Sequence, residues 1–258
     1  MQVIFAPLSI KGMNITIDIG NSRAKIGLFD GLKLVHFQNC DTINTAILSK
    51  VIAERIPSGQ KVNTIISSVA GTQFDWEPLL HNLGKVFWMR PGIRLPILID
   101  YKTPETLGSD RIAVAIAAAH RYQTKNILVF QAGSCLTHEF IREGKIYEGG
   151  GISPGLNMRF KALHTFTGRL PLINYKEIDF LPGKTTEESI LNGVINGMAA
   201  EIDGTIDRYR KNWDNLVVVI TGGDLMNFDK RLKNSIFALP NLVLEGLNII
   251  IGFNENLP

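Results

Sequence analysis

A β-hairpin pattern occurs twice in this chain, and the two copies are 113 residues apart (131 minus 18). Each copy begins with an apolar strand, at 14–19 and at 126–130, and runs into a glycine turn. The residues that coincide at this offset are Asp18 with Gln131, Gly20 with Gly133, Leu28 with Ile141 and Gly31 with Gly144, and Ser22 falls near Ser134. Because self-similarity at a fixed offset marks an internal repeat, the pattern predicts two duplicated halves.

Strands and helices alternate after each hairpin, which is typical of α/β layers rather than of an all-α or all-β fold. The expected further strands are 62–69, 85–89 and 216–220, and the expected helices are 43–56, 74–83, 111–122, 155–167 and 186–209. We therefore expect an N-terminal half over 1–124, with 1–12 as a possible tail, and a C-terminal half over 125–258.

The composition indicates a globular protein, with 45% hydrophobic and 20% charged residues among 258. The net charge of +3 is not concentrated in a basic run, so neither nucleic acid nor a membrane surface is an expected partner. Cys40 and Cys135 form no Cys-x-x-Cys pair, which argues against a disulfide scaffold or a zinc knuckle. No secretory signal or membrane span is evident, and a cytoplasmic location is expected.

The first candidate site is the turn that begins at Asp18 and ends at Arg23. Glycine at a strand end lets backbone N–H groups approach an anion, and a nearby carboxylate can hold hydrated Mg²⁺ against a phosphate. The alternative is a polar hairpin turn in which Asp18 only caps backbone groups.

The second candidate site is the segment 101–111, which leads directly into an alanine-rich helix. Asp110 and Arg111 are expected at the N-terminus of that helix, where free N–H groups bind anions and a carboxylate can act as a general base. In the alternative interpretation, Ser109 or Asp110 only caps the helix.

Two further glycine segments precede or follow predicted elements. The segment 149–155 either brings backbone close to a ligand or allows two chain segments to pack tightly. The segment 221–224 ends a buried strand, where ligands of α/β proteins gather. The chain has neither a P-loop nor a strand-linked Gly-x-Gly-x-x-Gly sequence, and its histidines lack metal-ligand spacing.

Taken together, these motifs resemble the type III pantothenate kinases of the actin-like, sugar-kinase and Hsp70 ATPase superfamily. The resemblance runs from Met13 through nearly the whole chain, and its most specific part is the segment 101–111. It implies two ribonuclease-H-like halves facing across a cleft, and a homodimer. It also implies ATP-dependent phosphorylation of pantothenate to 4'-phosphopantothenate, the first step of coenzyme A biosynthesis.

The same resemblance implies roles for individual residues. Asp110 is the expected general base, and Asp18 is expected to position Mg²⁺ through water. The expected ATP-binding residues are Asp18, Ile19, Gly20, Asn21, Ser22, Arg23, Ala24, Lys25 and Ser134. The expected pantothenate-binding residues are Tyr101, Gly108, Ser109, Asp110, Arg111 and Thr186, the last from either the same subunit or the partner.

One residue departs from the family pattern. Where the family usually has aspartate, at the monovalent-cation position, this chain has Gln131. An amide oxygen ligates K⁺ more weakly than a carboxylate does, so reduced or altered K⁺ activation is expected. Gln131 also favours a rival interpretation, a non-catalytic accessory factor that binds nucleotide. A third interpretation is a different small-molecule kinase or a nucleotide hydrolase on the same fold, which the segment 101–111 argues against.

Overall fold

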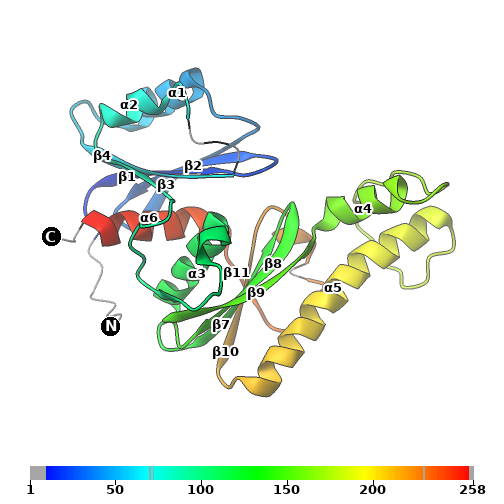
Figure 1. Ribbon diagram of the computed structural model, residues 1–258. Helices are drawn as coiled ribbons and strands as arrows, with labels where there is room; N and C mark the ends of the chain where they lie inside the picture. The colour runs from blue at the N-terminus through cyan, green and yellow to red at the C-terminus, as the bar shows by residue number, and fades with distance from the viewer. Residues whose placement is uncertain (1–9, 70, 72, 229, 256–258) are drawn as a thin grey trace. The chain divides into compact units, whose positions relative to one another are not determined.

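The computed structural model describes residues 10–69, 71, 73–228 and 230–255, and Figure 1 shows its helices and strands. The chain forms two compact units. The first runs from the start of the described residues to Arg121 and resumes at Leu242, and the second comprises Tyr122–Asn241. Among the described helices, none is long and apolar enough to cross a membrane.

The sheet of the first unit has the strand order β3-β2-β1-β4-β5. The first three strands form antiparallel pairs, and β4 and β5 extend the sheet in parallel with β1. These strands are β1 (Met13–Ile19), β2 (Ala24–Asp30), β3 (Lys33–Cys40), β4 (Val62–Ser68) and β5 (Val86–Trp88).

Helices pack against this sheet within the first unit. Leu48 and Leu80, from α1 and α2, are fully buried in one core cluster with Ile17 of β1. Helix α6 contacts β1, β2 and β4 and packs along α3. The elements are α1 (Thr45–Arg55), α2 (Glu77–His81), β6 (Leu98–Ile99), the 3-10 helix η1 (Pro104–Thr106), α3 (Ser109–Arg121) and α6 (Leu242–Glu255).

The contact between α3 and α6 depends on small residues. A Cβ atom on Gly246 would overlap the backbone carbonyl of Ala113, so only glycine permits this approach of the two helices. Asn248 of α6 anchors the helix to the hairpin, since it accepts a 2.9 Å hydrogen bond from Asn14 and donates one of 2.8 Å to the carbonyl of Gly31.

The sheet of the second unit repeats the topology of the first. The strands that belong to this unit have the order β11-β10-β7-β8-β9, with antiparallel β7–β8 and β8–β9 pairs and parallel β7–β10 and β10–β11 pairs. The strands are β7 (Asn126–Ala132), β8 (Cys135–Arg142), β9 (Ile146–Pro154), β10 (Leu216–Thr221) and β11 (Phe237–Ala238). Strands β1 and β7 begin and end 113 residues apart, as the repeated pattern predicts.

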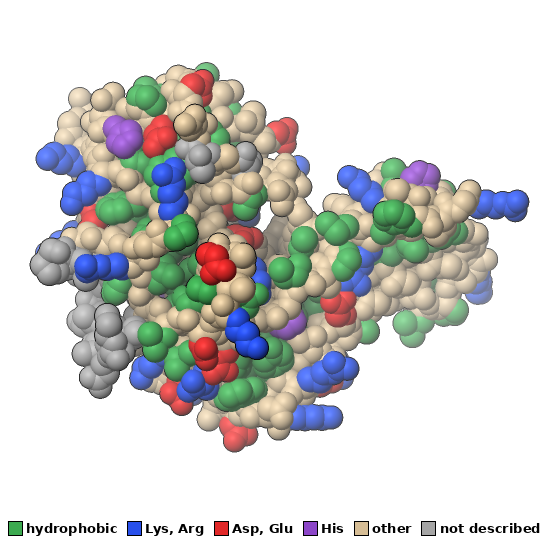
Figure 2. Space-filling view, in the orientation of Figure 1, with side chains coloured by type: hydrophobic (Ala, Val, Ile, Leu, Met, Phe, Trp, Pro, Cys, Tyr) green, Lys and Arg blue, Asp and Glu red, His purple; other side chains and the backbone are tan. Residues whose placement is uncertain are grey.

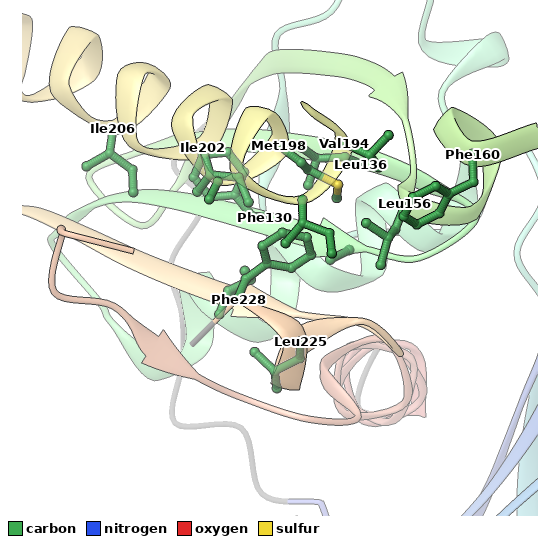
Figure 3. Close-up of a cluster of buried hydrophobic side chains, with 14 of the residues drawn as sticks. Phe130, Leu136, Leu156, Phe160, Val194, Met198, Ile202, Ile206, Leu225 and Phe228 are labelled. Atoms are coloured by element: carbon green, nitrogen blue, oxygen red, sulfur yellow. The ribbon is translucent and has the colours of Figure 1, made fainter. Parts of the chain in front are cut away.

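The core of the second unit lies between this sheet and the long helix α5 (Thr186–Asn212). Figure 3 shows Met198 and Ile202 of α5 in the cluster around Phe130 of β7. Helix α4 (Leu156–Thr165) adds Leu156 and Phe160, and the 3-10 helix η2 (Leu225–Asn227) adds Leu225. The Thr185 hydroxyl accepts a hydrogen bond from Glu188 N and so caps α5.

The predicted α/β fold with two duplicated sheets is confirmed, but some elements differ from the expectation. The glycine segment 149–155 lies mostly in strand β9, and β3 and α6 fall outside all of the predicted strand and helix ranges. The division into halves 1–124 and 125–258 stays a prediction, although α6 packs with the first unit. Of the possible tail 1–12, residues 1–9 lie outside the described part of the chain.

Candidate active site

The carboxylate of Asp18 lies at the end of β1 and is buried, with 8% of the residue exposed. Lys25 stands directly opposite it in the β1–β2 hairpin, and Ser67 is its neighbour in the parallel register of β4. The hydroxyl of Ser67 donates a 3.3 Å hydrogen bond to Asp18 Oδ1. Sheet pairing thus gathers a cation and a hydroxyl around one acid.

Burial raises the pKa of Asp18 from 3.8 to about 6. Lys25 lowers this pKa, the negative charge of Asp110 raises it, and the hydrogen bond from Ser67 lowers it. The folded protein therefore stabilises the ionised carboxylate of Asp18 less than water would. A divalent cation near this carboxylate would supply the missing compensation, so Asp18 fits the expected position for Mg²⁺.

A second hydroxyl connects this cluster to helix α3. Ser109 is the first residue of α3, and its Oγ lies 2.8 Å from Ser67 Oγ, within hydrogen-bond distance. Asp110 follows in the first turn, where the helix dipole favours a negative charge. The first unit therefore brings Asp18, Ser109 and Asp110 into one neighbourhood.

The carboxylate of Asp110 is half-buried and lies over Gly108. Its Oδ1 accepts a 2.9 Å hydrogen bond from the backbone N–H of Arg111. A Cβ atom on Gly108 would lie 2.7 Å from the same oxygen, so glycine leaves the space that this carboxylate occupies. The predicted placement of Asp110 and Arg111 at the helix N-terminus is confirmed, and Arg111 is buried.

The predicted ATP-binding turn of the first unit is short and exposed. Gly20 N donates a 3.0 Å hydrogen bond to Arg23 O, which closes the turn, while Asn21 and Ser22 face solvent. Exposed amide and hydroxyl groups at a strand end are suited to contacting phosphate oxygens.

In the second unit, the equivalent turn at Gly133 and Ser134 is enclosed by two glycines. A Cβ atom on Gly155 would overlap the carbonyls of Gly133 and Ser134, and one on Gly222 would overlap Ala132. Gly222 also has a φ of +105°, in the left-handed region. The glycine segments at 149–155 and 221–224 thus hold the backbone of this turn by close packing.

Gln131 occupies the position in β7 that Asp18 occupies in β1. Thr221 is its neighbour in the parallel register of β10, just as Ser67 is the neighbour of Asp18. The second unit therefore retains a buried hydroxyl beside a neutral amide, whereas the first unit has a hydroxyl beside a carboxylate.

No cluster of three or more histidine, cysteine, aspartate or glutamate side chains suited to a metal ion occurs among the described residues.

Thr186 is the first residue of α5. It lines a pocket of about 960 Å³ between α4 and α5, together with Lys184 and Arg159. Arg159 donates a hydrogen bond to the Pro154 carbonyl and pairs with Glu201 of α5, which fixes its guanidinium beside the pocket. Tyr101 is half-buried in the segment that precedes α3.

The sequence of this chain matches known kinases over most of its length. The model of the family described as type III pantothenate kinase matches residues 14–208. A type III pantothenate kinase from Cytophaga hutchinsonii is 44% identical over 242 residues, which cover 94% of this chain and all of the relative.

Solved structures support the fold. A protein from Campylobacter jejuni assigned to a Baf family of transcriptional activators is 23% identical, with a TM-score of 0.56 over 94% of this chain and all of that one. A protein from Sinorhizobium meliloti named as a candidate 2-dehydro-3-deoxygalactonokinase has a TM-score of 0.57 at 12% identity, over 95% of this chain and all of that one. At these identities the structural likeness shows the fold alone. The family match and the Cytophaga relative together show that the chain belongs to the type III pantothenate kinase family.

Proposed function

We propose that this chain transfers the γ-phosphoryl group of ATP to the terminal hydroxyl of pantothenate, giving 4'-phosphopantothenate for coenzyme A synthesis. The observation that carries the proposal is the family match over residues 14–208. The first unit supports it, because Asp18 and Ser109 both contact Ser67 and Asp110 follows Ser109 in the first turn of α3.

Asp110 is the proposed general base. Phosphoryl transfer requires alignment and charge compensation more than covalent help, and the attacking hydroxyl must lose its proton. The first turn of α3 holds the Asp110 carboxylate in place through the N–H of Arg111. Asp110 would therefore accept the hydroxyl proton while Ser109, Arg111, Gly108 and Tyr101 contact pantothenate.

The two glycine turns are the proposed phosphate-binding segments. The turn from Asp18 to Lys25 offers exposed side-chain donors and backbone N–H groups, and Ser134 offers a hydroxyl in the second unit. Bound Mg²⁺ would neutralise charge on the ATP phosphates. Asp18 would hold that ion through water, because its carboxylate is buried with incomplete compensation of its charge.

Gln131 is the proposed monovalent-cation position, with weakened K⁺ binding. Its side chain can offer a neutral amide oxygen, whereas a carboxylate would add a full charge. We expect the enzyme to respond to K⁺ less than a family member that has aspartate there.

A homodimer through the α4–α5 region is the proposed assembly. Large apolar side chains are exposed in or beside α4 and before α5, and Figure 2 shows hydrophobic atoms on this part of the surface. These side chains are Met158, Phe166, Leu172 and Leu181. Exposed apolar patches commonly mark protein interfaces. In such a dimer Thr186 would contact pantothenate bound to the same subunit or to the partner subunit. The cytoplasmic location of the protein stays a prediction.

The test of the proposed function is a coupled phosphorylation assay with ATP, Mg²⁺ and pantothenate. We expect pantothenate-dependent formation of ADP and of 4'-phosphopantothenate, identified by mass spectrometry. Nucleotide binding without turnover would support the accessory-factor alternative, and ADP release without pantothenate would support a nucleotide hydrolase.

A further inference from the structure

Ser67 of β4 contacts both Asp18 and Ser109, and neither a sequence motif nor the proposed roles above include it. Its side chain is 1% exposed. It contacts Asp18 Oδ1 at 3.3 Å and Ser109 Oγ at 2.8 Å, so it joins strand β1 to the first residue of α3.

When Asp18 is ionised, the hydrogen bonds that join Ser109, Ser67 and Asp18 can run in one direction only. An ionised carboxylate only accepts hydrogen bonds, so the single hydroxyl proton of Ser67 goes to Asp18. The oxygen of Ser67 then accepts the proton of Ser109. This orders both serine hydroxyls.

We propose that Ser67 is a positioning residue that fixes the Asp18 carboxylate relative to the start of α3, and hence relative to Asp110. The proposal rests on the kinase function proposed above and adds a residue to it. Asp18 lies on β1 and Asp110 on α3, and Ser67 contacts both Asp18 and Ser109, the residue that precedes Asp110. Residues that orient a ligand-binding carboxylate typically affect metal affinity or activity 10- to 100-fold.

The duplicated sheet supplies the conservative substitution. Thr221 occupies the same register position beside Gln131 and is 2% exposed, so a buried threonine is accommodated at this point of the repeated topology. Ser67→Thr retains a hydroxyl at the position, and Ser67→Ala removes it.

The same strand supplies the matched control. Ser68 is the next residue and points to the opposite face of the sheet, because side chains alternate along a strand. Its hydroxyl accepts a hydrogen bond from Gly71 N. Ser68→Ala therefore removes a hydroxyl from the face of the sheet opposite to Ser67.

The experiment compares wild type, Ser67→Ala, Ser67→Thr and Ser68→Ala by steady-state kinetics and by calorimetric binding of Mg²⁺ with the analogue AMPPNP. For Ser67→Ala we expect kcat and Mg²⁺-dependent AMPPNP affinity to fall about 10-fold or more, with the KM for pantothenate changed less than about threefold. We expect Ser67→Thr to recover most of both losses and Ser68→Ala to behave as wild type.

The proposal is overturned if Ser67→Ala matches Ser68→Ala in both measurements. It is also overturned if Ser67→Thr is as impaired as Ser67→Ala and both melt at lower temperature than Ser68→Ala, which would show a packing role only. If wild type phosphorylates no pantothenate, the proposed function fails, and the AMPPNP affinities still decide the role of Ser67.

Discussion

A carboxylate that is nearly excluded from water is costly to ionise, and Asp18 is such a group. Burial raises its pKa to about 6, against the opposing effects of Lys25 and Ser67. This raised pKa corresponds to about 3 kcal/mol of unfavourable free energy in the folded, ionised state. A chain selected for stability alone has no reason to keep this acid, so the cost indicates a functional role.

This cost predicts a pH-dependent effect of Asp18→Asn on stability. Because the folded pKa is raised, the native state holds its proton more tightly between pH 4 and about 6, and stability falls as pH rises through that window. We expect Asp18→Asn to be more stable than wild type at pH 8, by up to about 3 kcal/mol, and equal to it near pH 4. Urea unfolding of the apo protein at both pH values measures the difference. An advantage of the same size at both would show that ionisation is not its cause.

Asp110→Asn tests the proposed general base. Asparagine can still accept the N–H bond of Arg111, but it cannot take a proton from the substrate hydroxyl. We expect kcat to fall about 10²- to 10⁴-fold, with the melting temperature nearly unchanged. Steady-state kinetics and thermal unfolding measure both quantities, and near-normal turnover would refute the assignment.

Gln131→Asp tests the expected effect of glutamine at the cation position. Restoring a carboxylate adds a charge that attracts K⁺, so we expect the variant to be activated by K⁺ more strongly than wild type. Initial rates over a KCl series at constant ionic strength measure the response. A strong K⁺ response in wild type, equal to that of the variant, would contradict the prediction.

The sequence placed the two acids in the correct local structure but could not identify Ser67. Asp18 is marked by its glycine turn, and Asp110 by its position before an alanine-rich helix. Ser67 is 49 residues from Asp18 in sequence and becomes its neighbour only through the parallel pairing of β1 with β4. A serine in an apolar strand carries no local signal of such a contact.

At the scale of elements, close backbone packing explains the glycines around Gly133 and Ser134. Strand β9 ends at Pro154, and Gly155 then passes directly against this turn. The overlapping atoms belong to the backbone, so they cannot move aside as a flexible side chain can. The turn shape therefore depends on a residue that is distant in sequence.

Gly155→Ala is predicted to distort this turn. Overpacking against backbone typically costs about 1–3 kcal/mol, so we expect a lower melting temperature together with weaker ATP binding. Gly204→Ala is the matched control, since a Cβ atom there meets nothing within 4 Å in the interior of α5. We expect the free energy of unfolding of Gly204→Ala to exceed that of wild type by about 0.5–1 kcal/mol, because alanine loses less conformational entropy than glycine in a helix. Thermal unfolding and ATP titration compare the two, and equal behaviour of both variants would contradict this account.

The spacing of apolar residues predicted the helices that have one apolar face, and it missed a helix that is apolar on nearly all sides. Helices α3 and α5 begin and end within a few residues of the predicted ranges. Helix α6 is buried on nearly all sides, so its apolar residues show no helical stripe by which to identify it. The glycines of β9 suggest a loop, but pairing with β8 makes this segment a strand.

At the scale of the whole molecule, the proposed homodimer predicts that one apolar substitution changes the assembly state. Leu181 is 73% exposed just before α5, in the proposed interface region. We expect Leu181→Glu to shift the protein from dimer to monomer in sedimentation velocity. Met226 is equally exposed but belongs to η2, so Met226→Glu is the control and should remain dimeric. A monomeric wild type, or dissociation of both variants alike, would contradict the proposed interface.

The packing of α6 on the first sheet has a consequence for biosynthesis. Strand β1 and its neighbouring strands emerge from the ribosome early. Helix α6, which contacts β1, β2 and β4, emerges only after the entire segment Tyr122–Asn241. The part of the protein that is translated first is therefore the last to be completed. The apolar face of the sheet that α6 covers in the folded protein therefore stays uncovered during most of synthesis. We expect chaperones to bind the nascent chain at this face.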